Sequence, residues 1–568
     1  DTFNGKAPSQ LKPSYNGVDY TNSVNRYIGD MFGDFVSVID FGADASGSSN
    51  SRDAFQDAIN TGKHVYVPTG TYKIESPINM STPGQMLSGD GRIRSVLIAQ
   101  PGFTGNGVIV SAVMEEGPII RDLKITCVQP DPATVSSRAN LNTYPPALYF
   151  VHVPRFTVQD VQITLFQYGI DMTDNSGGAF INLLEMSCFD IGITINGSLD
   201  TVRINGLQFW PFDMIGTNYQ NLFNDFSCIG ITSGRCDDLK LTDCLFINGG
   251  WHIYLYAGTL PGLSGSTFGS ANNCSFDTWG SIAVVSNGTN FLMDNCYWSW
   301  ANVFDSGQHA IYQTGGLLQI NNSRILEQST SAYGGASDIY VGGTSRFLFT
   351  GCEVLRSVYS SANRLMYFDN SVSAIVADSR FDCGDMVYAL PHIECASDVN
   401  LVATGNAFNR VGTANPGYAI ALNGDVNNVV ANNSFQNWNL RFPTGTQLVS
   451  VLSRNSYSSV TKNPPGFAVN NVLASRVAGT TYTNNTCDTI FVEISANCLP
   501  TTFGEIGLQV VIGGVTKYHS QSIPALAAGS YGVSTITGFV PPGASYKCMI
   551  YAGSVTIATW YESSGTCV

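Results

Sequence analysis

A short motif of polar and apolar positions recurs along the middle of the chain. In each copy a polar residue or glycine comes first, Cys, Ser or Asn comes second, and a large apolar residue comes fourth. The copies start at Asp243, Asn273, Asn295, Asn322, Gly351, Asp378, Gly405 and Asn432. Their spacing averages roughly 27 residues, and short strands that alternate in burial at such a period predict a parallel β-helix.

Weaker copies of the motif extend this pattern toward the N-terminus. They lie at Ile120-Arg121-Asp122-Leu123, Asp160-Val161-Gln162-Ile163 and Met186-Ser187-Cys188-Phe189. A single coil leaves strand edges unpaired on both sides, so coils must stack on one another. We therefore expect an all-β solenoid from about Val65 to about Leu452, with roughly 14 coils.

The second motif position holds many of the cysteines. Cys is small and readily buried, so it suits a position that points into the solenoid and repeats from coil to coil. Examples are Cys188, Cys244, Cys274, Cys296 and Cys352. The 14 cysteines include no C-x-x-C pair, so thiolate metal sites are not expected. Free core thiols, formed in a reducing cytoplasm, are the favoured interpretation, and disulfides are the alternative.

The regions flanking the solenoid have different patterns. The apolar residues Val24, Tyr27, Ile28, Met31 and Phe35 have a helix-like spacing. Residues 51–61 predict a short amphipathic helix that caps the open end of the solenoid. After Pro464-Pro465-Gly466, short alternating strands separated by turn residues predict a β-sandwich. The predicted domains are therefore 1–64, 65–460 and 461–568.

Composition excludes several functions. The 568 residues carry a net charge of −15, which argues against binding a nucleic-acid backbone. No apolar run is long enough for a membrane span, and no signal peptide is visible. The six histidines are dispersed and no metal or phosphate-loop motif is present, so no metal or cofactor is expected. The first residue is not Met, so an upstream segment could be missing.

Several segments resemble a known superfamily. Val36-Ser37-Val38-Ile39-Asp40-Phe41-Gly42-Ala43-Asp44, the following residues 53–59, and Val65-Tyr66-Val67-Pro68 resemble the start of the pectate-lyase-like right-handed β-helix. Residues 25–30, 479–484 and 540–546 resemble parts of bacteriophage tailspikes. This resemblance implies a homotrimer in the virion tail that binds and usually cleaves a bacterial surface polysaccharide. It also implies a head-binding domain upstream of this chain.

The candidate chemistry is concentrated between residues 251 and 356. Hydrolysis of a glycosidic bond needs two carboxyl groups, and sugars need aromatic platforms. Glu327 and Asp305 form the favoured catalytic pair, because residues about one repeat apart fall on neighbouring coils roughly 5 Å apart. Asp277 and Asp338 are further catalytic candidates. The candidate substrate-binding residues are Trp279, Trp300, His309, Tyr312 and Arg356. The residue type at the position of Glu327 varies between coils, which favours an exposed face there.

Three functions remain open on the sequence. The first is an endo-acting glycoside hydrolase of capsule, exopolysaccharide or O-antigen. The second is a polysaccharide lyase on the same scaffold, which would need a carboxylate cluster and an Arg base. The third is an adhesin that binds glycan without cleaving it, and the concentration of Trp and acidic residues argues modestly against it.

Overall fold

The structure is a computed structural model, and it divides into two compact units, residues 1–363 and 364–568. The described residues are 10–11, 14–15, 18–19, 26–27, 33, 35–113, 115–225, 227–278, 282–300, 309–327, 337–356, 364–384, 391–396, 398–410, 418–423, 428–436, 439–441, 451–453, 456–458, 468–471, 475–484, 490–498, 504–512, 515–523, 532–541, 544–552 and 554–564. Each unit is described by itself.

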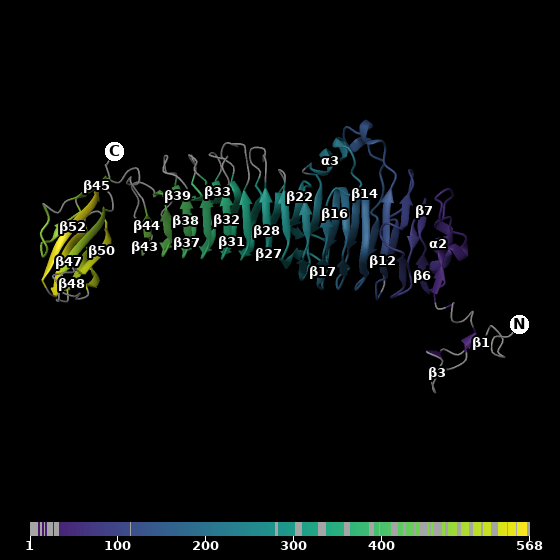
Figure 1. Ribbon diagram of the computed structural model, residues 1–568, viewed down its shortest axis with the longest axis horizontal. Coiled ribbons are helices and arrows are strands. Elements are labelled where there is room, and N and C mark those ends of the chain that lie inside the picture. Colours follow the sequence, from purple (N-terminus) through teal and green to yellow (C-terminus); the bar gives the residue numbers. More distant parts are fainter. Residues whose placement is uncertain are drawn as a thin grey trace. The chain divides into compact units, whose positions relative to one another are not determined.

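Parallel strands dominate the first unit (Figure 1). They are β5 (Phe35–Ser37), β6 (His64–Val67), β7 (Gly70–Ile74), β8 (Ile78–Asn79), β9 (Met86–Gly89), β10 (Ser95–Ala99), β11 (Ile109–Ala112), β12 (Ile119–Cys127), β13 (Leu148–Val151), β14 (Thr157–Thr173), β15 (Phe180–Asn182), β16 (Glu185–Asn196), β17 (Val202–Asn205), β18 (Gln208–Phe209), β19 (Ile229–Ser233), β20 (Leu239–Thr242), β21 (Leu245–Ile247), β22 (Trp251–Leu255), β25 (Phe268–Asn272), β26 (Ser275–Thr278), β27 (Ile282–Asp294), β28 (Tyr297–Trp300), β29 (Ile311–Asn321), β30 (Arg324–Glu327), β31 (Ser337–Thr350) and β32 (Glu353–Arg356). The predicted parallel β-solenoid is confirmed.

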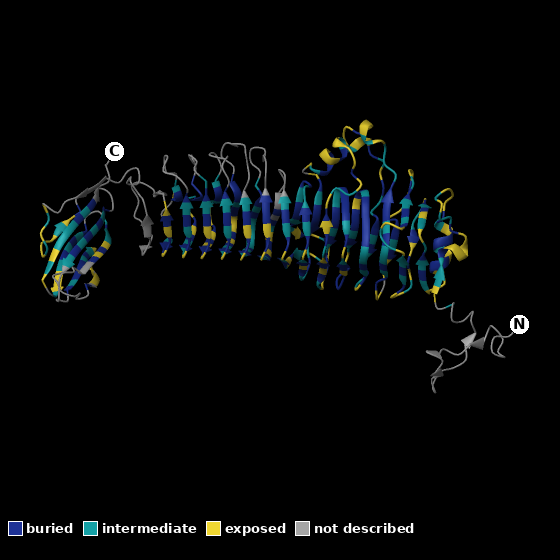
Figure 2. Ribbon diagram, viewed as in Figure 1, coloured by how far each residue is buried: buried dark blue, intermediate teal, exposed yellow. Residues whose placement is uncertain are grey.

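Each later coil of this unit contributes strand segments to three ladders. The first ladder contains β21, β26, β28, β30 and β32. The second contains β22 and the first halves of β27, β29 and β31, and the third contains β20, β25 and the second halves of the same long strands. Buried and partly exposed residues alternate along the strands (Figure 2), as expected when successive side chains point to opposite faces.

The interior of the first ladder is a column of large apolar side chains. Phe246, Phe276, Trp298, Ile325 and Val354 are register partners in successive coils, and all five are fully buried. The rings of Phe246 and Phe276 stack with their centroids 5.3 Å apart. Because one large ring or branched side chain fills the same level of every coil, this column fixes the register of the stack. The prediction that Trp298 points inward is confirmed.

The turn from the third ladder to the first explains why the motif starts with Asn, Asp or Gly. Asp243, Asn273, Asn295, Asn322 and Gly351 occupy this turn with φ between 48° and 64°. This left-handed backbone is tolerated best by Gly, Asn and Asp. Asp294 is the last residue of β27, immediately before this position, and its Oδ1 accepts a hydrogen bond from Asn322 Nδ2 at 2.9 Å. Asp294 therefore has a structural role at this turn.

Free, buried cysteines follow these turn residues. The 11 cysteines whose side chains are described are all buried thiols, and they include Cys188, Cys244, Cys274, Cys296 and Cys352. Burial raises the pKa of the Cys352 thiol to about 12. The Cys352 thiol is therefore protonated at neutral pH and acts as a small apolar side chain with weak hydrogen bonds. The prediction of core thiols is confirmed for these cysteines.

The beginning of the chain differs from the prediction. Helix α2 (Arg52–Asn60) is present, with Ala54, Phe55, Ala58 and Ile59 buried. The helix-like spacing of residues 20–35 is misleading, because Arg26–Tyr27 forms strand β4 and pairs antiparallel with β1 (Gln10–Leu11). Phe35 pairs in parallel with His64. The parallel ladder thus begins with β5, before the predicted start at Val65, since backbone pairing outweighs the local apolar spacing.

Three smaller elements complete the first unit. Strands β2 (Ser14–Tyr15) and β3 (Val18–Asp19) form one antiparallel pair, and β23 (Ala257–Gly258) and β24 (Gly265–Ser266) form another. Helix α3 (Thr217–Phe223) buries Tyr219, Leu222 and Phe223. Figure 1 shows that α3 lies in a segment that projects beyond the strands of the coils.

The second unit begins with further parallel strands. They are β33 (Arg364–Phe368), β34 (Ser373–Ala377), β35 (Arg380–Cys383), β36 (Ile393–Cys395), β37 (Asn400–Thr404), β38 (Ala407–Arg410), β39 (Tyr418–Leu422), β40 (Val429–Ala431), β41 (Ser434–Gln436), β42 (Asn439–Arg441), β43 (Val451–Ser453) and β44 (Ser456–Ser458). Phe381, Phe408 and Phe435 are fully buried register partners. Their rings stack at 4.6 and 5.1 Å, so the same apolar-column principle holds in this unit.

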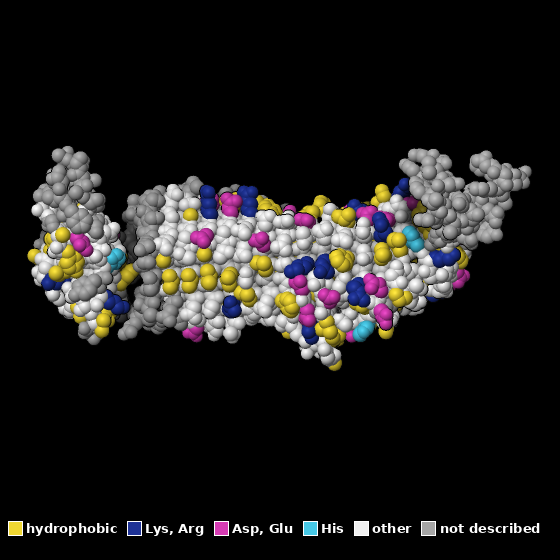
Figure 3. All heavy atoms as spheres, turned by 90° about the horizontal axis from the view of Figure 1, so that it is seen from below, with side chains coloured by type: hydrophobic (Ala, Val, Ile, Leu, Met, Phe, Trp, Pro, Cys, Tyr) yellow, Lys and Arg dark blue, Asp and Glu magenta, His cyan; other side chains and the backbone are white. Residues whose placement is uncertain are grey.

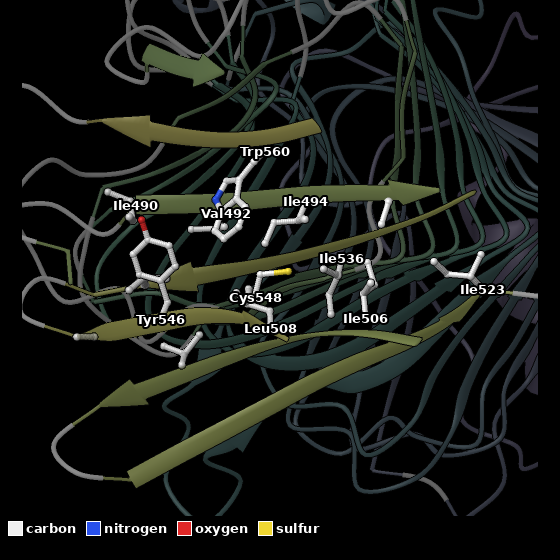
Figure 4. Close-up of a cluster of buried hydrophobic side chains, with 14 residues drawn as sticks. Ile490, Val492, Ile494, Ile506, Leu508, Ile523, Ile536, Tyr546, Cys548 and Trp560 are labelled. Atoms are coloured by element: carbon white, nitrogen blue, oxygen red, sulfur yellow. The ribbon is translucent and has the colours of Figure 1, made fainter. Parts of the chain in front are cut away.

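The last part of the second unit is antiparallel. One sheet has the order β45 (Ala468–Asn471), β52 (Val555–Ser564), β47 (Ile490–Cys498) and β50 (Gly532–Val540). The other has the order β46 (Tyr482–Thr483), β51 (Ser545–Ala552), β48 (Gly504–Ile512) and β49 (Val515–Ile523). Side chains from both sheets form one buried core, which includes Trp560, Ile494, Leu508 and Tyr546 (Figure 4).

Candidate active site

The sequence-predicted residues that the structure describes lie where strands of the first ladder end and strands of the second ladder begin. We call these strand ends corner A. First-ladder strands enter it at Thr278, Trp300, Glu327 and Arg356, and the second-ladder strands β27, β29 and β31 begin after it. Thr278, Trp300, Glu327 and Arg356 are consecutive register partners. The repeat alignment that matched these four positions is therefore confirmed.

Part of the predicted site lies outside the described residues. Trp279 and Asp305 lie outside them, and for Trp300 and Glu327 only the backbone is described. The catalytic pair of Glu327 and Asp305 stays a prediction. The register does place Glu327 one position beyond the column that contains Asp277, Ser299 and Leu326. Asp277 and Glu327 thus do not share a column.

Asp338 and Arg356 form a buried ion pair at corner A. Asp338 Oδ2 lies 3.6 Å from Arg356 Nη2, and the two side chains are only 1% and 2% exposed. We predicted that the motif position of Glu327, which Arg356 occupies in the next coil, lies on an exposed face. This prediction is wrong for Arg356, because its side chain is buried. The reason is that a long cationic side chain can turn inward when a carboxylate from the next ladder neutralises it. These two residues link the first and second ladders and do not reach solvent.

Aromatic rings line the second ladder beside the same corner. His309 and Tyr312 stack with ring centroids 5.6 Å apart, and both stack on Tyr340, at 4.9 and 5.1 Å. Tyr312 and Tyr340 are register partners on neighbouring coils. The structure thus brings the two predicted residues His309 and Tyr312 together and adds Tyr340. The sequence analysis missed Tyr340, although its position one repeat beyond Tyr312 was a usable signal.

His309 is held in one orientation. Its Nδ1 lies 2.7 Å from the carbonyl oxygen of Ser337, and this carbonyl can only accept, so Nδ1 carries the proton. Burial lowers the pKa of His309 below the ordinary 6.5, partly offset by this hydrogen bond. The imidazole is therefore mainly neutral at neutral pH. A neutral, flat ring in a stack is suited to packing against a sugar face.

Asp277 is a partly exposed carboxyl of this site, in contrast to the fully buried Asp338. It is half-buried on the first ladder, two positions after Ser275 and opposite Ser299. Burial raises its pKa above the ordinary 3.8, and a hydrogen bond from Ser299 partly offsets the rise. Tyr297, on the neighbouring coil, is 36% exposed. Trp210 is 44% exposed and directly follows Phe209 of β18, two coils before the coil of Asp277. A carboxyl with a raised pKa, on a face that also carries partly exposed rings, has the chemistry of a general acid toward a sugar.

The second ladder carries another half-buried carboxyl that sequence reasoning missed. Asp171 belongs to an outward column that continues through Thr194, Thr232, Tyr254, Val285, Tyr312 and Tyr340. Burial raises its pKa above 3.8, and its Oδ1 is buried without a hydrogen-bond partner. Asp171 lies outside the aromatic-rich segment of the sequence. Only the long-range register connects it to Tyr254 and Tyr312.

Metal and membrane features were also examined. The described part of the chain contains no group of three or more His, Cys, Asp and Glu side chains that could hold a metal ion. Within that same part, no helix is long and apolar enough to cross a membrane.

Comparison with known proteins agrees with this architecture. Residues 35–219 match the family model described as rhamnogalacturonase A/epimerase, pectate lyase-like. The solenoid has the pectate-lyase-like fold. Tailspike protein 3 of bacteriophage CBA120 is similar in structure over 85% of this chain and 70% of that chain, with 13% identity and a TM-score of 0.51. The predicted resemblance of this pectate-lyase-like β-helix to a tailspike is confirmed at the level of the fold.

Other solved structures are more distant. The pre-mature gene product 12 of bacteriophage phi29 shares 14% identity over 74% of this chain and 58% of that chain, with a TM-score of 0.49. An α-1,3-glucanase from Streptomyces thermodiastaticus shares 14% identity over 75% of this chain and 69% of that chain, with a TM-score of 0.38. No curated protein sequence matches the chain.

Proposed function

We propose that this chain is a phage tailspike that binds a bacterial surface polysaccharide and cleaves it by endo-glycosidic hydrolysis. The observation that carries the proposal is Asp277, a half-buried carboxyl with a raised pKa, with the partly exposed ring of Tyr297 on the neighbouring coil. The stacked rings of His309, Tyr312 and Tyr340 on the other side of corner A support it. The match to a family of polysaccharide-processing enzymes and the tailspike-like fold point the same way.

In this proposal Asp277 is the general acid. A carboxyl whose pKa is raised keeps its proton to higher pH and can donate it to the leaving glycosidic oxygen. Glu327 and Asp305 are the proposed partners, one of which would activate water or attack the anomeric carbon. The rings would hold the sugar units on either side of the scissile bond. Asp338 and Arg356 would act as positioning residues, because their buried pair joins the strands on both sides of corner A.

A chain-length assay tests this function. Polysaccharides purified from a panel of bacterial strains are incubated with the protein, and the products are separated by size. We expect shortening of at least one polysaccharide, loss of most of the rate in Asp277→Asn, and little change in Asp294→Asn, a control on the third ladder. Binding without shortening would favour an adhesin, and products that absorb in the near ultraviolet would favour a lyase.

We also propose that the chain works as a homotrimer in the virion tail. The second unit carries an outward apolar row, because Ile375, Val402 and Val429 are register partners and remain partly exposed. Threefold closure would bury this row without leaving an open-ended assembly. Light scattering during gel filtration tests it. A trimer that Val402→Asp dissociates is expected, and a wild-type monomer in dilute buffer would refute it.

A further inference from the structure

A strip of outward side chains runs along the second ladder in the early coils, before the coils of corner A. Its central column consists of Tyr149, Asp171, Thr194, Thr232 and Tyr254, which are register partners in successive coils. Neighbouring strands lie roughly 5 Å apart, so this column spans about 20 Å. We use the name early strip for Tyr149, Asp171, Trp251, Tyr254 and Tyr256.

Three aromatic rings gather at one end of the early strip. The ring centroids of Trp251 and Tyr254 are 5.1 Å apart, and the rings of Tyr254 and Tyr256 stack at 5.6 Å. His252 and Ile253 are both buried, so Trp251 and Tyr254 on either side of them share the outward face of β22. All three rings are partly exposed, and a cluster of this kind suits the apolar face of a sugar.

Asp171 differs from many other charged side chains of the early coils. On the face drawn in Figure 3, Lys and Arg side chains gather with Asp and Glu over the coils toward the right, nearer the N-terminus. Arg92, for example, lies 2.9 Å from Asp160. Within the described part of the chain, Asp171 has no ion pair, and its Oδ1 is buried without a hydrogen-bond partner. A buried acceptor without a partner is costly, so one that is kept in a native structure points to a functional role.

Two phenol groups lie within electrostatic reach of Asp171. Burial raises the pKa of Tyr149 above the ordinary 10.0, and Asp171, its register partner, adds to the rise. Burial also raises the pKa of Tyr256, and Tyr254 and Asp171 add to that rise. Both phenols are therefore neutral at neutral pH and can donate a hydrogen bond. Among the described residues no group accepts from either hydroxyl, so both can bind a ligand.

Inserted segments border the early strip at both ends of its strands. Helix α3 lies between β18 and β19 and contacts the segment before β13, where Asn218 Nδ2 donates to the Pro132 carbonyl at 3.0 Å. The segment that contains α3 projects beyond the strands of the coils (Figure 1). At the other end, the hairpin β23–β24 follows β22, and its Ser264 carbonyl accepts from Arg235 Nη1 at 3.3 Å. The strip therefore lies between two structured insertions.

We propose that the early strip is a second saccharide-binding site of this chain. A sugar packs its apolar face on the three clustered rings, and its hydroxyl groups exchange hydrogen bonds with Asp171 and the neighbouring phenols. A carboxyl suits hydroxyl groups because it accepts from them and, in its protonated form, also donates to them. The site lies on the second ladder and Asp277 lies on the first, so this inference goes beyond the proposed catalytic site.

Retention of polysaccharides tests the site separately from catalysis. The full-length Asp277→Asn protein is applied to immobilised polysaccharides from the panel of bacterial strains, so that cleavage does not remove the ligand. In this background, Tyr254→Ala combined with Tyr256→Ala should weaken retention of a bound polysaccharide about tenfold, because two sugar-packing rings are lost. Tyr551→Ala, at a 44% exposed tyrosine in the C-terminal sheets, is the matched control and should leave retention unchanged.

A carboxyl pair extends the same experiment. Asp171→Ala should weaken retention about fivefold, because hydrogen bonds to the sugar are lost. Asp53→Ala, at an 87% exposed carboxylate of α2, should have no effect. Full retention in the double tyrosine variant and in Asp171→Ala would overturn the early strip and leave the proposed function intact. Retention of no polysaccharide by any of the proteins would overturn both.

Oxidative footprinting of Asp277→Asn locates the site without a substitution in the strip. Hydroxyl radicals oxidise accessible tyrosine rings, and mass spectrometry of peptides measures the extent of oxidation. A saturating amount of the retained polysaccharide should reduce oxidation of Tyr149, Tyr254 and Tyr256 and leave that of Tyr551 unchanged. Unchanged oxidation of the three tyrosines of the strip would show that the polysaccharide binds elsewhere and would overturn the inference.

Discussion

The early coils and the later coils of the solenoid use charged side chains in opposite ways. In the early coils, charges face outward and pair on the surface. Arg92 contacts Asp160 at 2.9 Å and Glu185 at 3.2 Å, and its side chain is 34% exposed. In the later coils of the first unit, Arg356 turns inward and pairs with the buried Asp338. The outer faces there carry partly exposed rings together with the surface pair of Arg324 and Glu353, whose side chains are 57% and 42% exposed.

The difference shows how one scaffold separates stability from function. Both groups of coils fill the interior with apolar columns, so the outward positions are free to differ. A surface ion pair contributes little to stability, whereas a buried one becomes costly when it is broken. The comparison therefore makes quantitative predictions, which follow from the largest effect to the smallest.

The largest effect is expected from breaking the buried pair. Arg356→Met leaves Asp338 buried without its cation and should lower the free energy of unfolding by about 3 to 5 kcal/mol. The double variant Arg356→Met with Asp338→Asn removes both charges and should recover most of that loss. Denaturant unfolding of the three proteins measures the effect. A loss below about 1 kcal/mol in the single variant would mean that this pair resembles a surface pair.

The next effect concerns activity. Asp277→Asn should slow depolymerisation by about a hundredfold or more, the usual contribution of a general acid. Because the pKa of Asp277 is raised, its protonated form stabilises the folded chain below pH 3.8, and this contribution is lost as pH rises through the raised pKa. The amide variant should therefore be at least as stable as the wild type at neutral pH. Melting curves at acidic and neutral pH check the sign, and a less stable variant at neutral pH would contradict it.

A smaller effect is expected at the second motif position, which is often Cys in the first unit and is Asn in the later coils of the second unit. In the second unit Asn406 Oδ1 accepts from the Ser379 amide at 3.0 Å, and its Nδ2 donates to the Val376 carbonyl at 2.8 Å. Asn406→Ala leaves both buried groups unpaired and should cost about 2 kcal/mol. Cys274→Ala, at the same motif position in the first unit, removes only weak thiol contacts and should cost about 1 kcal/mol. Equal losses by denaturant unfolding would show that the two positions are equivalent.

The smallest effect is expected at the surface pairs of the early coils. Arg92→Met removes the contacts with Asp160 and Glu185 and should cost less than about 1 kcal/mol. The cost should shrink further at high salt, since these partly exposed charges are screened. Unfolding midpoints at two salt concentrations measure it. A loss as large as that of Arg356→Met would remove the contrast between the two groups of coils.

The sequence predicted the features that repeat. The period, the small residue at the second motif position and the large apolar residue at the fourth recur from coil to coil, so they could be read from the sequence alone. The burial of Asp338 and Arg356 could not, because it depends on one partner supplied by another ladder. Asp171 was missed for a similar reason, since only the register across several coils aligns it with Tyr254 and Tyr312. Glu327 and Asp305 remain predictions.

The helix-like spacing of residues 20–35 led to a wrong expectation, because a local pattern there did not give the local structure. A local apolar pattern predicted helical turns there, but Arg26–Tyr27 and Phe35–Ser37 are strands held by pairing with residues 10–11 and 64–66. In so short a segment, a few apolar residues fit either period, and the partner strand decides. The amphipathic helix at residues 52–60 was predictable because its apolar face is longer and covers the first coil.

The most direct test of the central claim is a crystal structure of the trimer with a bound oligosaccharide from a polysaccharide that it shortens. The account predicts sugar rings packed on Tyr312 and Tyr340, with the glycosidic oxygen that is to be cleaved within hydrogen-bonding distance of Asp277 or of the Glu327 and Asp305 pair. An oligosaccharide bound away from corner A would contradict it.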